Sequence, residues 1–353
     1  MKTYQIAVLP GDGIGPEVTT EAVKVLEALA EQDEHFNFET TEFPWNSDYY
    51  VTHGKMMPED GLEQLKSFDT ILFGAIGDAR VSDLVTIWEL ILPIRKNFQQ
   101  FINFRPIKLL KGLDSPLQQE KPIDFAIIRE NSEGEYSDSG GIMFAGEERE
   151  MAVQNTVMTR QGIRQLTEFA CEYALEHGAT KITNATKSNV ISYAMTFWDR
   201  VVEETLEQHG ELAYEKYYID ALAAYFVQRP ESFEVVIASN LFGDILSDLG
   251  SAIVGGLGFA PSGNINPTGE FPSMFEAVHG SAPDIAGKGI ANPIAQIWSA
   301  ALMLEHLGHK ELHDRVLAAI EATLVENKTL TPDIGGNATT SEVGDAIIEK
   351  LKQ

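Results

Sequence analysis

Short apolar runs alternate with longer amphipathic runs along most of this chain. The runs at residues 70–75 and 235–238 are short, continuous and apolar, as buried strands are. Residues 16–30 instead repeat their apolar side chains every three or four positions, which predicts a helix. Strands that alternate with helices are typical of a sheet covered by helices, so the sequence predicts an α/β fold.

The composition narrows the classes of partner. The 353 residues suffice for two domains, and a formal net charge of −27 argues against binding to nucleic acid or to anionic membranes. No apolar run has membrane-spanning length, and the N-terminal strand passes into a glycine-rich turn, unlike a signal peptide. The single cysteine, Cys171, cannot form an internal disulfide. We therefore expect a cytoplasmic protein.

The N-terminal motif at residues 11–17, GDGIGPE, lies between a predicted strand and a predicted helix. This order suggests a dinucleotide site, but a GxGxxG pattern beginning at Gly11 would need glycine where Pro16 stands. The motif is therefore not the Rossmann fingerprint. Its glycines either let the backbone approach a ligand closely or simply form the turn, and the sequence leaves both interpretations open.

Asp244 and Asp248 stand four positions apart in the run ASNLFGDILSDLG, residues 238–250. On a helix this spacing puts both carboxylates on one face, one turn apart, where they repel each other. Two solvated surface aspartates are the commoner explanation of such a pair. Here the neighbours are Leu, Ile, Phe and Gly, so we favour a divalent cation with oxygen ligands.

Several polar residues follow predicted strands or lie on predicted helices. Arg95, Arg105 and Arg129 could each hold a carboxylate with two hydrogen bonds, and ordinary surface ion pairs are an equal alternative. Tyr136 and Lys187 come just after strand ends, where α/β proteins place functional groups, although either could be purely structural.

The loop from His279 to Asn292 has glycines at 280, 287 and 289 and leads into a predicted helix. Asn292 suits the N-cap of that helix, and Pro293 suits its first position. Backbone N–H groups and a helix N-terminus favour phosphate, so this loop is a candidate nucleotide cradle. The alternative is a tight connecting loop.

Long motifs resemble the β-decarboxylating dehydrogenases, the family of isocitrate and isopropylmalate dehydrogenases. Members oxidise (2R)-hydroxy diacids with NAD or NADP and Mg²⁺ or Mn²⁺. The matching motifs span almost the whole chain in the family's order: GDGIGPE (11–17), NFRP (103–106), RENSEGEYS (129–137), ATKSN (185–189), NLFGDILSDLG (240–250) and VHGSAPDIAGKGIANP (278–293).

The resemblance implies an isopropylmalate dehydrogenase-like two-domain α/β/α fold. Residues 1–101 plus 256–353 would form the large cofactor-binding domain. Residues 102–255 would form the middle domain, with the metal site and the dimer interface. The family also implies a homodimer in which each active site is built from two chains.

The resemblance also assigns roles to individual residues. Tyr136 would protonate the enol, and Lys187 of the partner subunit would be the base for the substrate hydroxyl. Asn189 would lie near the nicotinamide. The other assigned residues are Asp244 and Asp248 with Asp220 of the partner subunit for the metal; Arg95, Arg105 and Arg129 for the substrate carboxylates; and His279, Gly280, Ser281, Ala282, Pro283, Asp284, Ile285 and Asn292 for the adenosine half of the cofactor.

The cofactor is expected to be NAD. Asp284 and Ile285 stand where NADP-dependent isocitrate enzymes of the family carry Lys and Tyr for the 2′-phosphate. An aspartate there can hydrogen-bond a ribose diol and would repel a phosphate. The metal is expected to be Mg²⁺ or Mn²⁺.

The substrate is expected to be a small hydroxy diacid. The segment WELILPIR lacks the Ser and Asn with which isocitrate enzymes meet a third carboxylate. Ile91 and Leu92 fit the leucine positions of isopropylmalate enzymes, but Trp88 replaces their Glu and would narrow the pocket. Residues 45–65 resemble the D-malate/tartrate dehydrogenase branch.

We therefore expect NAD-dependent oxidative decarboxylation of D-malate to pyruvate and CO₂, with tartrate as a further candidate substrate. The alternatives are 3-isopropylmalate dehydrogenase and a non-catalytic metabolite-binding paralogue.

Overall fold

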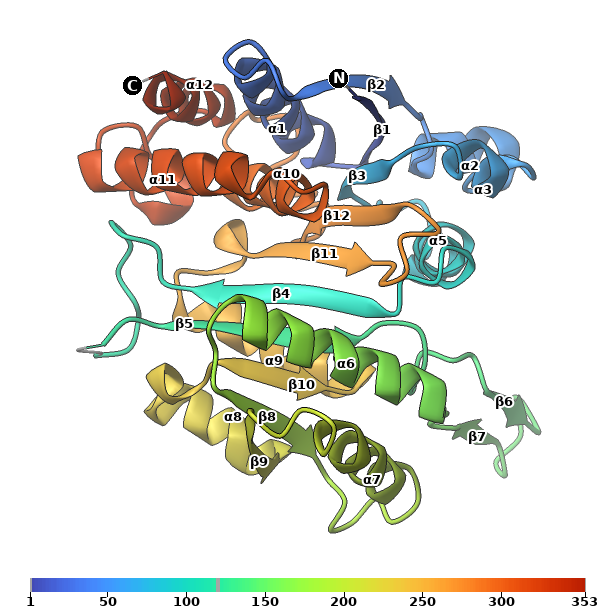
Figure 1. Ribbon diagram of the computed structural model, residues 1–353. Helices are drawn as coiled ribbons and strands as arrows, with labels where there is room; N and C mark the ends of the chain where they lie inside the picture. Colours follow the sequence, from blue (N-terminus) through green and yellow to red (C-terminus); the bar gives the residue numbers. More distant parts are fainter. Residues whose placement is uncertain (1, 119–120, 353) are drawn as a thin grey trace. The chain divides into compact units, whose positions relative to one another are not determined.

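The computed structural model describes residues 2–118 and 121–352 (Figure 1). The chain divides into two compact α/β units. Unit 1 comprises Met1–Gln99, Leu109–Gln118 and Ser251–Gln353, and unit 2 comprises Gln100–Lys108 and Gln119–Gly250. Each unit contains strands covered by helices, which confirms the predicted α/β class.

In unit 1 the strands follow the order β2-β1-β3-β12-β11. β1 pairs in parallel with β2 and β3, β12 pairs in parallel with β3, and β11 is antiparallel to β12. Their bounds are β1 Thr3–Gly11, β2 Asn37–Glu42, β3 Thr70–Ala75, β11 Pro261–Ile265 and β12 Ser273–Ala277.

The helices of unit 1 pack on one another as well as on the strands. α10, Ile294–His306, is buried from Ile294 to Leu304 because it is apolar on nearly every side. It contacts α1, Gly15–Ala30, as well as β11 and β12. The remaining elements are α2 Ser47–His53, α3 Gly61–Leu65, α4 Asp83–Thr86, a π-helical turn Ile87–Ile91, α5 Leu92–Asn97, α11 Lys310–Glu326, α12 Thr340–Leu351, and the short 3₁₀ turns Leu257–Phe259 and Pro332–Ile334.

A buried apolar cluster joins the strands of unit 1 to α5. Alternate residues of a strand point to the same face, so Ala7 and Leu9 of β1 lie beside Ile71 and Phe73 of β3. The other members are Phe43, Trp45, Met56, Leu65, Leu90, Ile94, Phe98 and Met274.

In unit 2 the strands follow the order β4-β5-β10-β8-β9. β4 is antiparallel to β5, and the other pairs are parallel. A separate antiparallel pair, β6 with β7, stands apart from these strands (Figure 1). The bounds are β4 Ile102–Lys108, β5 Asp124–Glu130, β6 Gly140–Met143, β7 Met151–Gln154, α6 Arg160–Glu176, β8 Lys181–Thr186, α7 Ala194–Leu206, β9 Ala213–Tyr218, α8 Ile219–Gln228, a 3₁₀ turn Pro230–Ser232, β10 Val235–Ala238 and α9 Asn240–Ile253, whose last turn belongs to unit 1.

Two segments differ from what their sequence pattern alone predicts. The pattern predicts one helix from Val85 to Phe101, interrupted at Pro93, but a π-helical turn precedes the proline and α5 ends at Asn97. Proline has no N–H to donate to the preceding turn, and the backbone reverses at Gln99 with a φ of +49°. The alternating pattern of residues 153–159 likewise predicts a strand, but β7 ends at Gln154.

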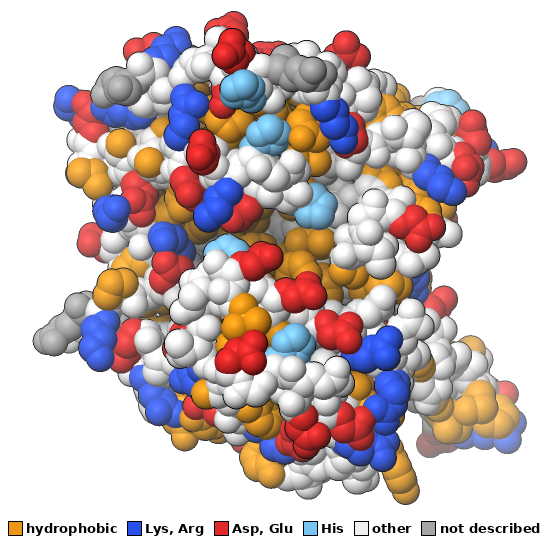
Figure 2. Space-filling view, in the orientation of Figure 1, with side chains coloured by type: hydrophobic (Ala, Val, Ile, Leu, Met, Phe, Trp, Pro, Cys, Tyr) orange, Lys and Arg blue, Asp and Glu red, His pale blue; other side chains and the backbone are white. Residues whose placement is uncertain are grey.

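Acidic side chains are spread over the visible face of the protein rather than gathered in one patch (Figure 2). This distribution suits a solvated surface. Within residues 2–118 and 121–352, no helix is both long and apolar enough to cross a membrane.

Candidate active site

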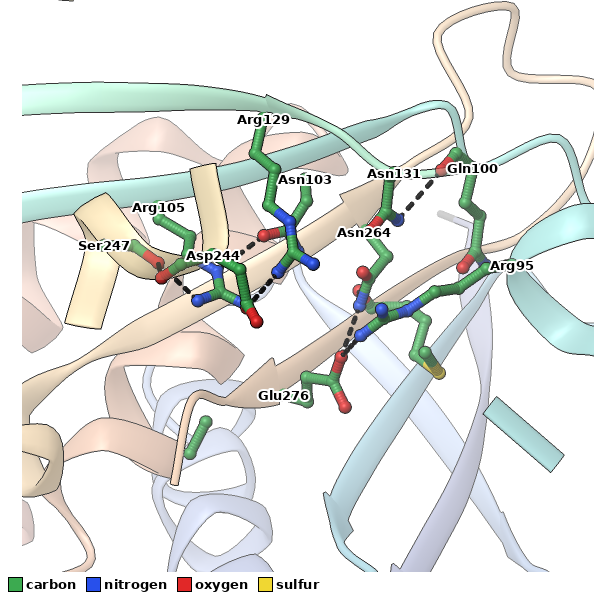
Figure 3. Close-up of polar contacts among 12 residues, drawn as sticks. Arg95, Gln100, Asn103, Arg105, Arg129, Asn131, Asp244, Ser247, Asn264 and Glu276 are labelled. Carbon is green, nitrogen blue, oxygen red and sulfur yellow. Dashed lines mark hydrogen bonds and ion pairs between the residues drawn. The ribbon is translucent and has the colours of Figure 1, made fainter. Parts of the chain in front are cut away.

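The adjacent strands β4 and β5 bring two buried arginines together in unit 2. Asn103 lies directly opposite Arg129 in the antiparallel register, and Arg105 follows two residues later on the same face. The Arg105 Nε donates to Asn103 Oδ1 over 2.6 Å (Figure 3). Both arginines are almost inaccessible to solvent, so their charges need nearby carboxylates.

The carboxylates come from α9, which is separated from β10 by a single residue, Ser239. Asp244 Oδ1 lies 2.5 Å from Arg129 Nη1 and 3.5 Å from Arg105 Nη2 (Figure 3). Asp248, one turn later, lies 3.9 Å from Arg105 Nη1. The side chains of Asp244 and Asp248 are 37% and 61% exposed, so both carboxylates keep an accessible edge beside the buried arginines.

Gly243 lets α9 approach the Arg129 side chain. A Cβ at this position would lie 2.5 Å from Cγ of Arg129, closer than real contacts allow. Asn240, at the start of α9, accepts a hydrogen bond of 2.7 Å from Arg129 Nη2. The helix thus holds the guanidinium from two successive turns.

Tyr136 adjoins this group. Its hydroxyl donates to Asp244 Oδ2 over 3.2 Å, and the Arg129 guanidinium lies 5.7 Å from the ring centroid. Burial, followed by the negative charge of Asp244, raises the pKa of Tyr136 above its ordinary value of 10.0. The phenol therefore keeps its proton at neutral pH and can donate it.

The pair of carboxylates fits a hard divalent cation in its donor chemistry. Partial loss of solvent raises the pKa of Asp248 although its side chain is 61% exposed; the nearby Arg105 opposes this shift, and the charge of Asp244 adds to it. A cation would relieve the repulsion between the two carboxylates. Among the described residues no three His, Cys, Asp or Glu side chains form a group that could hold a metal, so a complete site would need oxygen ligands from elsewhere.

Lys187 and Asp220 form a separate pair in unit 2. Each follows the end of a parallel strand, β8 or β9, and these strands are neighbours. The Lys187 Nζ lies 2.5 Å from Asp220 Oδ1, and its hydrogen bond lowers the pKa of Asp220. Asn189 is exposed two residues after Lys187. This pair lies outside the group formed by Asp244, Arg105 and Arg129.

Arg95 belongs to unit 1. Its Nη2 donates to Glu276 Oε1 over 2.6 Å, and Asn264 Nδ2 donates to the same oxygen over 2.7 Å (Figure 3). Both side chains of the ion pair are largely buried. The guanidinium is therefore already fixed by Glu276, which lies on β12.

The loop 279–292 of unit 1 keeps several polar groups available. Burial lowers the pKa of His279, so its ring is neutral, and its buried Nε2 has no hydrogen-bond partner among the described residues. Pro283 and Asp284 are exposed, whereas Ser281 is buried. α10 begins at Ile294, so Pro293 rather than the expected Asn292 is its N-cap, and Asn292 Oδ1 accepts from Ile294 N over 3.0 Å. An unpartnered imidazole nitrogen and an exposed carboxylate fit a ribose-containing ligand.

Sequence reasoning missed Asn103, Asn240, Ser247 and Glu276. Asn240, Asp244, Ser247 and Asp248 have the spacing i, i+4, i+7, i+8, so all of them could have been placed on one polar helix face. Ser247 Oγ accepts from Arg105 Nη1 over 2.5 Å. The signal for Glu276 is that it is the one charged residue of the strand SMFEA.

The fold is that of a known class of dehydrogenases. A crystal structure of isocitrate dehydrogenase from Methylococcus capsulatus superposes with a TM-score of 0.89 and 30% sequence identity, covering 99% of this chain and 100% of that one. Comparison of the sequence with family models identifies the family. The model of the isocitrate/isopropylmalate dehydrogenase family matches residues 5–347, so the chain belongs to this family of oxidoreductases.

Curated relatives resemble the chain over its full length. A probable tartrate dehydrogenase/decarboxylase of Bacillus subtilis (strain 168) is 49% identical, with 100% of this chain and 99% of the relative aligned. The D-malate dehydrogenase [decarboxylating] of Escherichia coli (strain K12) is also 49% identical, with 98% of each chain aligned.

Proposed function

We propose that this protein is an NAD-dependent enzyme that requires Mg²⁺ or Mn²⁺ and converts D-malate to pyruvate and CO₂, with tartrate as a further substrate. The observation that carries the proposal is the group of Arg105, Arg129, Asp244, Asp248 and Tyr136 in unit 2. It combines buried cations for substrate carboxylates, accessible oxygen ligands and a protonated phenol. The names of the relatives from B. subtilis and E. coli support the choice of substrate.

Asp244 and Asp248, with Asp220 of the partner subunit, would hold the metal. When bound, the metal would polarise the substrate oxygens and stabilise the charge that develops on them, and NAD would accept the hydride. Arg95, Arg105 and Arg129 would bind the two carboxylates through charge-assisted hydrogen bonds.

Two residues would move the protons. Lys187 of the partner subunit would accept the proton of the substrate hydroxyl as hydride leaves the same carbon. Loss of CO₂ from the resulting β-keto acid leaves an enolate, and Tyr136 would donate its proton to the carbon that carried the departing carboxylate. The raised pKa of Tyr136 supports this role, because the phenol is protonated when the enolate forms.

Lys187 and Asp220 are joined to each other, and Asp220 is 69% exposed. Together they would complete the site of a second copy of this chain in a homodimer. The β6–β7 arm supports the same assembly, because three apolar side chains on it are exposed: Ile142, Met143 and Met151, at 64%, 44% and 46%. A two-stranded sheet with exposed apolar side chains is marginally stable alone in water.

Asp284 supports the choice of NAD, since an exposed carboxylate can bind a ribose diol and would repel a 2′-phosphate. Asn189 of the partner subunit would adjoin the nicotinamide. The buried, unpaired Cys171 suits a cytoplasmic enzyme.

A panel of D-malate, L-tartrate and 3-isopropylmalate, assayed with Mn²⁺ and with NAD or NADP, tests the proposal. We expect the highest kcat/KM with D-malate and NAD. A higher kcat/KM with 3-isopropylmalate would assign the enzyme to leucine biosynthesis instead. No turnover with any of them, alongside tight binding of one, would favour a metabolite-binding protein.

A further inference from the structure

The N-terminal turn of α1 is joined to the loop 279–292 within unit 1. Ile14 N donates to the carbonyl oxygen of Ser281 over 2.9 Å. At Gly13, which has a φ of +58°, a Cβ would lie only 2.0 Å from the same oxygen. Glycine is therefore needed here so that the two backbones can approach each other.

Apolar contacts extend this junction along the loop. Ile14 and Val18 of the turn form a buried cluster with Ala291, and Ala282 and Ile285 pack against it. The turn and the loop therefore share a small core of their own. The glycine-rich turn therefore packs against the candidate nucleotide loop and supports it, and does not itself form a dinucleotide-binding fingerprint.

Glu17 makes the polar contact at the other end of this junction. Its Oε1 accepts a hydrogen bond of 2.6 Å from the backbone N–H of Gly287, where φ is +73°. The other oxygen, Oε2, is buried and has no partner among the described residues. The half-buried carboxylate is thus committed to one backbone group of the loop.

We propose that Glu17 is a positioning residue that fixes the loop 279–292 in its ligand-binding conformation before the cofactor arrives. The inference rests on the proposed function, in which this loop binds the adenosine half of NAD. A loop that is already ordered loses less conformational entropy on binding, so the contact strengthens NAD binding. It does not touch the reacting atoms, so hydride transfer at saturating NAD is unaffected.

The test compares Glu17→Ala and Glu17→Gln with the wild type. Glutamine keeps an oxygen that can accept from Gly287, whereas alanine does not. Glu27→Ala is the matched control, because it removes the same charge from an exposed position of α1. Two measurements are made on the full-length protein: hydrogen exchange of the amides at 282–289 without cofactor, and steady-state kinetics with varied NAD.

For Glu17→Ala we expect about tenfold faster exchange at Gly287 and about tenfold higher KM for NAD. The values of kcat and KM for D-malate, and the melting temperature, should stay close to those of the wild type. In Glu17→Gln, both the exchange rate at Gly287 and the KM for NAD should return most of the way to the wild-type values. Glu27→Ala should change neither value.

The two readouts separate this inference from the proposed function. Unchanged exchange at Gly287 in Glu17→Ala would overturn the inference whatever the substrate is. Equal losses in kcat, both KM values and melting temperature would also overturn it, because they would indicate a general structural role. If exchange rises as expected but the wild type does not bind NAD, the proposed cofactor is wrong and the loop serves another ligand.

Discussion

The Nζ of Lys187 lies 2.5 Å from Oδ1 of Asp220, so one ion pair joins two side chains that the family resemblance assigns to another subunit's active site. The pair arises because parallel neighbouring strands, β8 and β9, end side by side and each delivers one residue. In a dimer, one surface of unit 2 would then supply a base and a metal ligand together.

Lys187→Ala should lower kcat about 10³-fold, the usual range for removal of a general base. Binding of NADH, followed by its fluorescence, should be unchanged because the lysine does not belong to the loop 279–292. Lys181→Ala is the control, since Lys181 lies on β8, the strand that Lys187 follows, but pairs with Glu215. Wild-type turnover in Lys187→Ala would refute the assigned role.

Tyr136→Phe should lower kcat about 10²- to 10³-fold while leaving KM for D-malate nearly unchanged. A raised pKa means that the proton is lost only at higher pH than in free tyrosine. The kcat of the wild type should therefore show no loss due to Tyr136 as pH rises from 7 to about 9. Tyr217→Phe, which removes a phenol bonded to Glu215, is the control. A Tyr136→Phe enzyme with full kcat would show that another group donates the proton.

Trp88→Ala should shift preference towards bulkier substrates. Lys96 Nζ lies 4.8 Å from the centroid of the half-buried indole and holds it by a cation–π contact. Trp88 lies within the π-helical turn Ile87–Ile91. We expect kcat/KM for 3-isopropylmalate to rise at least about tenfold relative to D-malate. Lys96→Met should give a smaller shift. If the ratio of kcat/KM for 3-isopropylmalate to that for D-malate is unchanged in Trp88→Ala, the indole does not line the substrate pocket.

Asp284→Asn should narrow the preference for NAD. Removing the exposed carboxylate removes its repulsion of a 2′-phosphate and weakens its hydrogen bond to the ribose diol. We expect the ratio of kcat/KM for NAD to that for NADP to fall about tenfold. Asp333→Asn, whose carboxylate accepts from Asn292 Nδ2, is a control for general effects on this part of unit 1. If the wild-type enzyme prefers NADP, the assignment of NAD as the cofactor is wrong.

Local patterns in the sequence were enough to predict the α/β fold and to place some site residues, such as Asp244 and Asp248, next to each other on one helix. The spacing of Asp244 and Asp248 correctly indicated that both lie on one helix. Positive charge does lie beside this pair of carboxylates, and Arg129 supplies part of it, 2.5 Å from Asp244. Periodicity depends only on residues a few positions apart, which is why it is visible without a structure.

Contacts between distant segments could not be predicted in this way. Arg95 and Glu276 are 181 positions apart and meet only because α5 packs on strands of the same unit. The need for glycine at position 13 depends on the carbonyl of Ser281, in a loop near the other end of the chain. Such relationships are set by tertiary packing, which single-chain periodicity does not encode.

The central claim is that Lys187 of one chain serves Asp244 and Asp248 of another. Differently tagged chains can be co-expressed, and the heterodimer can be purified by both tags in turn. The first heterodimer pairs Lys187→Ala with Asp248→Asn, and the second pairs the double variant with a wild-type chain. Asp248 suits this test because its side chain is 61% exposed and its carboxylate lies 3.9 Å from Nη1 of Arg105, a longer contact than that of Asp244 with Arg129.

If sites are shared, the first heterodimer contains one intact site and should show about half of the wild-type kcat per dimer, whereas the second contains none and should be inactive. The reverse pattern, an inactive first heterodimer and a half-active second one, would place each complete site within a single chain and contradict the account.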